Sequence, residues 1–213
     1  GLTNDGAPSK NNSEPIARDG GWFIAAPLSN RLYQKSALGK PVDGGIILNE
    51  EEVMFCHWHR HIPLPEGWVD ERMKNNPNFA HKSVAFDVVR NAGEKVVPID
   101  GRWLRWPRES HPSKGDAEAV VRWARTGDDL DIGELLSWAQ KITDENMMAE
   151  LAIVDDEMDV TMYRLSLIDP KGSVTPATKD AYPLLGVEHL SQRFLREEEI
   201  DWIRGIDNPV TNL

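Results

Sequence analysis

Two apolar runs joined by a short acidic segment constrain the fold of this chain more than any other feature. Leu151–Val154 and Val160–Ile168 are rich in aliphatic and β-branched residues, and Asp155–Asp159 between them contains four acids. Because Asp is a common turn residue, the pattern predicts two antiparallel strands closed by a tight loop. The chain is therefore expected to contain a β-sheet with a dense negative charge at the end of one hairpin.

Helical and strand-like segments alternate ahead of this hairpin. The expected elements are a helix over Phe79–Ala92 ended by Gly93, strands at Val96–Ile99, Trp103–Trp106 and Ala117–Ala124, and a helix capped by Asp131 with Glu134 at the capping-box position. This order is typical of a small α/β sandwich around a mixed sheet. The core is expected to include Val97, Val120, Leu136, Ile153 and Leu165.

The N-terminal part has its own pattern. Residues 1–19 are rich in Asn, Ser, Gly, Pro and Lys, which predicts a disordered leader. Strands are expected at Trp22–Ala25 and Gly45–Leu48, followed by a helix capped by Asn49, with Glu52 completing a capping box.

Polar breaks divide the chain into four segments. Asn75–Asn78 is the expected domain boundary, and from Pro170 the chain turns polar before one last helix around Arg196–Ile203. The predicted organisation is a leader (1–19), an N-terminal α/β domain (20–75), a second α/β domain (79–169) and a tail (170–213).

Composition limits the classes of function. The net charge of -11 over 213 residues argues against nucleic-acid binding, because phosphate contacts need Lys and Arg. A single cysteine excludes an internal disulfide and fits a reducing cytoplasm, and neither a signal-peptide pattern nor an apolar run of about 20 residues is found. One basic segment stands apart, with Arg102, Arg105, Arg108, Lys114 and Trp106 as candidates for RNA contact; a solvated basic loop is the alternative.

Three histidines alternate along one segment. On a strand, His57, His59 and His61 would share a face and could bind a metal, but on the expected helix they spread around the axis. No acidic or cysteine ligand set follows at metal-site spacing. We therefore predict no metal site and no cofactor.

Several motifs, in order along the chain, resemble those of one family. The motifs are Arg31-Leu32-Tyr33, Gly39-Lys40-Pro41, Gly45–Leu48 with Glu50–Val53, Phe79–Val97, and the hairpin Leu151–Tyr163. Together they resemble the archaeal-type tRNA-splicing endonucleases, also called tRNA-intron endonucleases, over about residues 20–169. The segment 79–169 is similar to that family's nuclease domain.

The resemblance implies metal-free cleavage of precursor tRNA, in which a ribose 2′-hydroxyl attacks the neighbouring phosphate. The family uses a Tyr, a His and a Lys for the proton transfers and the developing charge. At the aligned positions this chain has Trp103 or Trp106, Asp116, and the stretch Asn146–Glu150. The triad is therefore expected to be missing, with His111 as a reserve candidate.

A non-catalytic role follows from this comparison. In the family the acidic hairpin loop docks into a basic pocket on the catalytic partner, which would assign docking to Asp155, Asp156, Glu157 and Asp159; a solvated turn is the alternative. The chain would then be a structural subunit or half of the endonuclease, partnered by a catalytic subunit or repeat and by precursor tRNA. A non-enzymatic α/β scaffold that binds a basic protein is the second hypothesis. The tail Leu195–Ile200 faintly resembles Leu48–Val53 and is either the start of a second repeat or a chance similarity.

Overall fold

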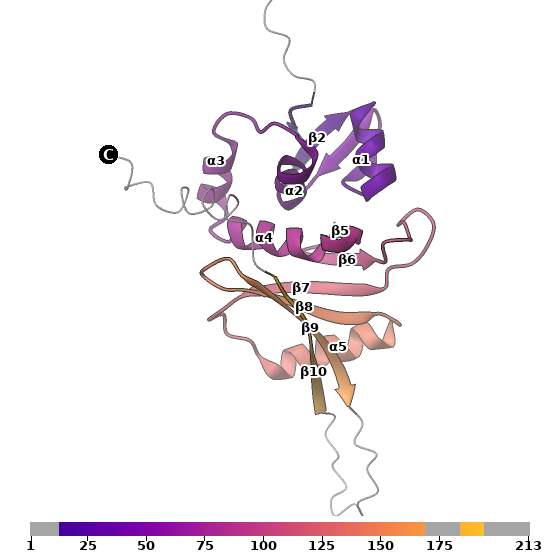
Figure 1. Cartoon of the computed structure of the whole chain (residues 1–213), viewed down its shortest axis with the longest axis vertical. Coiled ribbons are helices and arrows are strands. Elements are labelled where there is room, and N and C mark those ends of the chain that lie inside the picture. Colours follow the sequence, from indigo (N-terminus) through magenta and orange to yellow (C-terminus); the bar gives the residue numbers. More distant parts are fainter. Residues whose placement is uncertain (1–12, 169–183, 194–213) are drawn as a thin grey trace, which may run out of the picture. The chain divides into compact units, whose positions relative to one another are not determined.

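The computed structural model describes residues 13–168 and 184–193 (Figure 1). The chain divides into two compact units after Phe86, inside helix α4 (Phe79–Val89). The sequence instead suggested a division at Asn75–Asn78. We describe each unit by itself.

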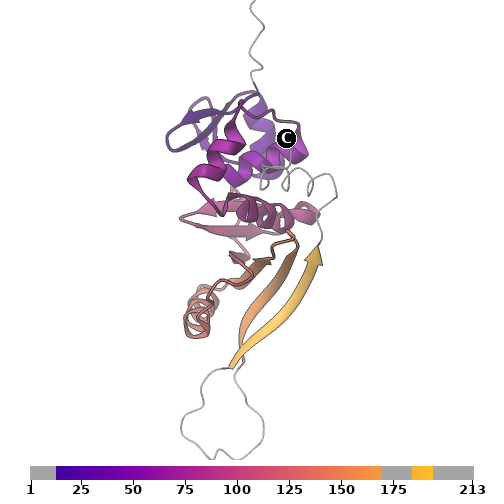
Figure 2. The ribbon, with the colours of Figure 1, turned by 90° about the vertical axis from the view of Figure 1, so that its left-hand side faces the viewer.

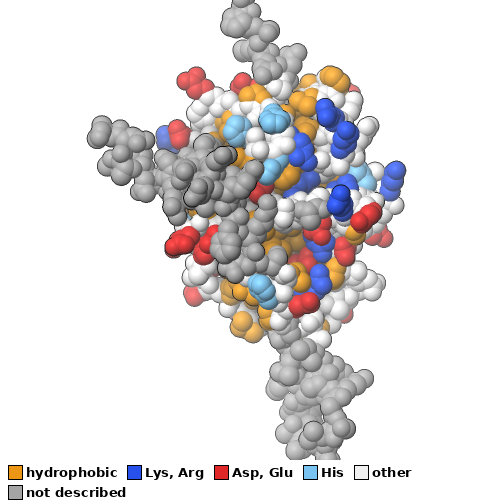
Figure 3. All heavy atoms as spheres, viewed as in Figure 1, with side chains coloured by type: hydrophobic (Ala, Val, Ile, Leu, Met, Phe, Trp, Pro, Cys, Tyr) orange, Lys and Arg blue, Asp and Glu red, His pale blue; other side chains and the backbone are white. Residues whose placement is uncertain are grey.

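The first unit is built on a four-stranded antiparallel sheet in the order β1-β2-β4-β3. Its elements are β1 (Ile16–Arg18), β2 (Gly21–Ala25), α1 (Leu28–Ser36), β3 (Lys40–Val42), β4 (Gly45–Leu48), α2 (Glu50–Arg60) and α3 (Trp68–Asn75), followed by the first part of α4. On the face shown in Figure 3, Lys, Arg and His side chains gather over the part of this unit formed by α1 and α2.

The start of α2 is fixed by Glu52. Its buried carboxylate accepts hydrogen bonds from the backbone N–H of Asn49 at 3.0 Å and of Gly39 at 2.6 Å. The first of these is the expected capping box, and the second ties the α1–β3 connection to the helix. Gly39 is needed there because its φ is +79° and an added Cβ would lie 2.9 Å from the Ile46 side chain.

The second unit is built on a six-stranded mixed sheet in the order β10-β9-β8-β7-β6-β5. After a short 3₁₀ turn at Asn91–Gly93, its elements are β5 (Lys95–Ile99), β6 (Arg102–Trp106), β7 (Ala119–Arg125), α5 (Ile132–Asp144), β8 (Met148–Val154), β9 (Val160–Ile168) and β10 (Leu184–Arg193). The β7–β8 pair is parallel, with α5 as its crossover, and the other pairs are antiparallel. Figure 2 shows α5 on one side of this sheet.

One row of small and aliphatic residues crosses the sheet and packs against α5. Leu104, Val120, Ala149 and Leu165 are paired in register across β6, β7, β8 and β9. They form a core with four residues of the helix, namely Leu135, Trp138, Ala139 and Ile142. Because side chains alternate along a strand, the neighbouring row, which includes Glu150 and Arg164, faces the other side.

The predicted mixed α/β class is confirmed. The acid-closed hairpin, the helices starting after Asn49 and Asp131, and the strands β2 and β4–β9 also match the sequence analysis within a few residues. The predicted leader is wrong at residues 16–18, which pair with β2, and residues 1–12 lie outside the described part. The predicted core is correct for Val120 and Leu165, whereas Val97, Leu136 and Ile153 are only partly buried.

Five elements were not predicted: α1, α3, β1, β3 and β10. The predicted helix at Arg196–Ile203 and the rest of 194–213 lie outside the described residues. Within the described residues, no helix combines the length and apolar character that crossing a bilayer requires.

Candidate functional site

Three stretches far apart in sequence meet at one end of the second sheet. The backbone N–H of Glu118 donates to the carbonyl of Arg105 at 2.8 Å, and the N–H of Met148 donates to the carbonyl of Glu118 at 2.9 Å. The end of β6, the start of β7 and the start of β8 therefore lie side by side. These are the stretches that the resemblance aligns with the catalytic Tyr, His and Lys.

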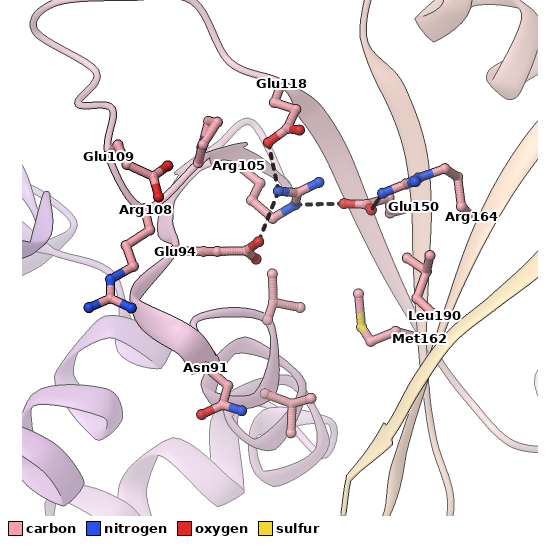
Figure 4. Close-up of a pocket in the computed structure, with 13 residues that line it drawn as sticks. Asn91, Glu94, Arg105, Arg108, Glu109, Glu118, Glu150, Met162, Arg164 and Leu190 are labelled. Atoms are coloured by element: carbon pink, nitrogen blue, oxygen red, sulfur yellow. Dashed lines mark hydrogen bonds and ion pairs between the residues drawn. The ribbon is translucent and has the colours of Figure 1, made fainter.

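A buried ion cluster lies at this end of the sheet, centred on Arg105. Its Nε donates to Glu150 Oε1 at 2.6 Å, and its Nη1 lies 3.0 Å from Glu118 Oε2 and 3.3 Å from Glu94 Oε1 (Figure 4). The side chains of Arg105 and Glu150 are 6% and 2% exposed, so both charges are removed from water. Such charges are tolerated only with close partners, and here each is the main partner of the other.

The cluster continues across the sheet. The second oxygen of Glu150 lies 3.1 Å from Arg164 on β9, and Arg164 lies 3.9 Å from Glu188 on β10. Glu150 thus bridges two guanidinium groups. We call Glu94, Arg105, Glu118, Glu150 and Arg164 the ion cluster.

The ion cluster shifts the titration of two members. Burial raises the pKa of Glu94, and the carboxylates of Glu150 and Glu118 add to this effect, which the Arg105 guanidinium only partly offsets. Burial alone would lower the pKa of Arg105, but its hydrogen bond to Glu150 and the surrounding carboxylates raise it. Arg105 is therefore a permanent cation.

A cavity of about 560 Å³ adjoins the ion cluster. Apolar residues of its wall come from Val88, Val89, Met162 and Leu190, and Arg108 and Glu109 lie on the β6 side (Figure 4). The cavity thus combines an apolar floor with carboxylates and guanidinium groups in nearly equal number. This is a poor receptor for a phosphate, because each guanidinium of the ion cluster already faces carboxylates.

The aligned positions have no group suited to the family's chemistry. Trp106 is buried and its indole N–H donates to the Gly115 carbonyl at 2.8 Å. Asp116 is exposed, and Met147 and Met148 precede Glu150 in the sequence, where the family's Lys is expected. An indole has no acidic hydroxyl to replace a phenol, and neither a carboxylate nor a thioether can supply the positive charge of an ammonium group.

The predicted RNA-contact residues separate into two groups. Arg102, Arg108 and Lys114 are exposed and could contact RNA. Arg105 and Trp106 are buried and hydrogen-bonded within the protein, so their side chains are not accessible to RNA. The reserve candidate His111 lies in the β6–β7 connection, with its Nδ1 2.7 Å from the Ser113 hydroxyl.

The acidic loop between β8 and β9 is held rigidly by Asp155. Its Oδ1 accepts from the backbone N–H groups of Glu157 at 2.9 Å and Asp159 at 3.0 Å, and its own N–H donates to the Asp159 carbonyl. Met158 is buried with φ +65°. Asp156 and Glu157 are exposed, and Asp156 has a weak contact with Arg125 at 3.5 Å. The loop therefore presents two of its acids to solvent, while Asp155 maintains its shape.

Sequence reasoning missed Glu94, Glu118, Glu150 and Arg164. A usable indication existed for two of them, because Glu150 and Arg164 interrupt otherwise apolar strands, and a charge inside such a run needs a partner. Within the described residues, no three His, Cys, Asp or Glu side chains are placed to hold a metal ion.

Comparisons with known proteins identify relatives of one kind. The chain is 25% identical over 181 residues to a tRNA-splicing endonuclease of Methanosarcina acetivorans, which covers 80% of this chain and 49% of the relative. It is 26% identical over 181 residues to the tRNA-splicing endonuclease of Methanosarcina barkeri, with the same coverage. It is 28% identical over 148 residues to an EndA-like protein of Methanopyrus kandleri, covering 65% of this chain and 86% of that protein.

The chain is therefore similar to archaeal tRNA-splicing endonucleases over most of its length. No family model matches it. The chain spans about half the length of the tRNA-splicing endonucleases that it matches. In this chain, the ion cluster occupies the end of the sheet to which the resemblance assigns the catalytic residues.

Proposed function

We propose that this chain is a non-catalytic half or subunit of a tRNA-splicing endonuclease that removes introns from precursor tRNA. The observation that carries the proposal is the ion cluster at the meeting point of β6, β7 and β8. The family relationship supports a role in tRNA splicing, and the cytoplasm is the expected location.

The chemistry of RNA cleavage explains why this site is unsuited to catalysis. Transfer of a 2′-hydroxyl onto phosphate needs an acid, a base and a cation that stabilises the charge on the phosphate. Burial raises the pKa of Glu94, which makes this carboxyl a candidate for proton exchange, but a single carboxyl group cannot serve as both acid and base. Arg105 cannot supply the cation, because Glu94, Glu118 and Glu150 surround it.

The acidic loop supports docking onto a basic catalytic partner. Asp156 and Glu157 stand on a loop whose backbone is already ordered by Asp155, so binding would cost little additional ordering of the chain. A fixed pair of exposed acids suits a basic pocket. Assembly and substrate support are then the contributions of this chain, and the catalytic triad is contributed by the partner.

A cleavage assay tests the proposal. The purified chain is incubated with an intron-containing precursor tRNA, alone and together with a catalytic subunit of the family. We expect no intron excision by the chain alone and excision when the catalytic subunit is present. Excision by the chain alone would overturn the proposal, and its loss in His111→Ala or in Glu94→Gln would identify the residue responsible.

The second candidate, a scaffold without an RNA role, rests on the exposed acids of the same loop. The two candidates differ in one result. A scaffold would bind a basic protein but would not change the rate of tRNA cleavage by the catalytic subunit, whereas the proposed subunit increases it.

A further inference from the structure

The C-terminal ends of α1 and α2 lie side by side in the first unit. Arg60, the last residue of α2, donates from Nη2 to the hydroxyl of Ser36, the last residue of α1, at 3.0 Å. Arg31 and Lys35 are four residues apart on α1, which places them on one face of that helix. His59 and His61 flank Arg60. We call Arg31, Lys35, His59, Arg60 and His61 the basic end.

Three members of the basic end have no acidic partner among the residues that the structure describes. Arg31, Lys35 and His61 are exposed and take part in no ion pair within the described part of the chain. Helix α1 contains no acidic residue. The acids of α2 are Glu50, Glu51 and Glu52 in its first turn, and about 1.5 Å of rise per residue separates them from Arg60 by more than a Debye length of about 8 Å.

Those three acids are also occupied elsewhere. Glu51 lies 3.0 Å from Lys82, Glu50 pairs with the same ammonium group, and Glu52 accepts from two backbone N–H groups. The basic end is therefore expected to have a positive electrostatic potential, although the whole chain carries a net charge of -11.

Two side chains of the basic end are held in place by an aromatic ring. The guanidinium carbon of Arg60 lies 5.3 Å from the centre of the Phe55 ring, and the His59 ring lies 4.7 Å from it. A cation fixed in this way loses little conformational freedom when it binds an anion. The arrangement is more ordered than a set of solvated surface lysines.

Interactions with the helix ends do not account for all of the basic residues. Cations are common in a last turn because they interact with free carbonyls. Here the helix ends are closed by the backbone, since the N–H of Ala37 donates to Tyr33 and the N–H of Ile62 donates to Cys56. Arg60 adds one bond to the His59 carbonyl, whereas Arg31 lies too far from the end of α1 to contribute.

We propose that the basic end binds the phosphate backbone of RNA, as a second contact surface of the precursor tRNA substrate. The proposal rests on the proposed function, which supplies the RNA. Phosphates accept hydrogen bonds from guanidinium, ammonium and imidazole groups, and two helices that meet at Arg60 and Ser36 contribute these groups. The contacts would carry no sequence information and would position the tRNA on the first unit.

The test is binding of an intron-containing precursor tRNA to the full chain between 50 and 200 mM salt. The variant is Arg31→Glu with Lys35→Glu, and the control is Lys74→Glu with Lys141→Glu, which changes the net charge equally at exposed lysines in the last turns of α3 and α5. We expect the variant to bind more weakly, with a log–log salt slope smaller by about two, because each lost phosphate contact lowers that slope by about one. The control should retain the wild-type slope.

Three outcomes would overturn the proposal. They are an equal loss in variant and control, no salt-dependent RNA binding by the wild-type chain, and loss of assembly with a catalytic subunit while RNA affinity is unchanged, which would assign the surface to an acidic protein. Circular dichroism and Arg31→Gln with Lys35→Gln check that weakened binding is not caused by unfolding of α1. RNA binding is measured on the chain alone and does not require the acidic loop to dock onto a partner. A failure of the proposed docking would therefore appear in the assembly assay and not in the RNA-binding assay.

Discussion

Glu150 is a single carboxylate on which two buried or half-buried guanidinium groups depend. Replacing it by Gln keeps the shape of the side chain but leaves Arg105 without its main partner and Arg164 without its nearest one. Removing one member of a buried pair typically costs about 3–5 kcal/mol. We expect Glu150→Gln to lower the free energy of unfolding by that order, measured by urea denaturation.

The matched control is Glu188→Gln, whose carboxylate also faces Arg164 but is 65% exposed and 3.9 Å away. Exposed pairs contribute about 0–1 kcal/mol. Equal losses of stability for the two variants would contradict the structural role assigned to Glu150.

Glu94 makes the stability of the chain depend on pH in a predictable direction. Because its pKa is raised in the folded state, the favourable contribution of its protonated form is complete below the unfolded pKa of about 4.3 and is lost as pH rises through the folded value. Glu94→Gln removes this dependence. We expect the free energy of unfolding of the variant, relative to wild type, to increase with pH from about pH 4 upward. Denaturation curves across that range are the measurement, and a relative decrease would contradict it.

At the scale of single elements, two neighbouring leucines of helix α5 differ in burial. Leu135 is 3% exposed and packs against the sheet, whereas Leu136 is only partly buried. We expect Leu135→Ala to cost about 2–5 kcal/mol of unfolding free energy and Leu136→Ala clearly less. Thermal or urea unfolding of both variants checks the assignment. A larger loss at Leu136 would show that the face of α5 is assigned wrongly.

The acidic loop gives a second test at this scale. Asp156→Asn with Glu157→Gln removes the two exposed charges and keeps Asp155, so we expect stability within about 0.5 kcal/mol of wild type. Assembly with the catalytic subunit and the resulting cleavage should both weaken. Sizing of the complex and a splicing assay measure this. Unchanged assembly and activity would leave the loop a solvated turn.

Asp155→Ala serves as a comparison for that loop. It removes an acceptor of two backbone hydrogen bonds, so assembly would weaken through loss of loop shape rather than of charge. We expect Asp155→Ala to lower the free energy of unfolding by about 1–3 kcal/mol. The Asp156→Asn, Glu157→Gln variant should not show this loss.

The sequence predicted the elements that are determined by residues near them in the chain, and it missed those that depend on distant partners. The β8–β9 hairpin and the starts of α2 and α5 depend on neighbouring residues, namely turn acids and caps, and were predicted. Helix α1 and strand β3 lack such indications, because α1 has no side-chain cap and few apolar residues. Strand β10 reads as polar because it is an edge strand with exposed Glu188 and His189, and its place depends on pairing with β9. The ion cluster was missed for the same reason, since its members come from three strands and from the connections that precede two others.

At the scale of the whole molecule, charge separation should govern association with a basic partner. The chain carries a net charge of -11, while the basic end has three Lys and Arg residues and helix α1 has no acid. Long-range attraction between opposite charges accelerates association and is screened by salt, with a Debye length of about 8 Å at physiological ionic strength.

We expect the association rate with the catalytic subunit to fall steeply as salt increases, and the dissociation rate to change less. The Asp156→Asn, Glu157→Gln variant should retain part of this salt dependence, because the remaining acids still produce the field, but should dissociate faster, because it lacks the local contacts. Surface plasmon resonance at several salt concentrations separates the two rates. An association rate that does not vary with salt would mean that the negative charge of the chain has no part in assembly, and the docking role of the acidic loop would then have to rest on shape alone.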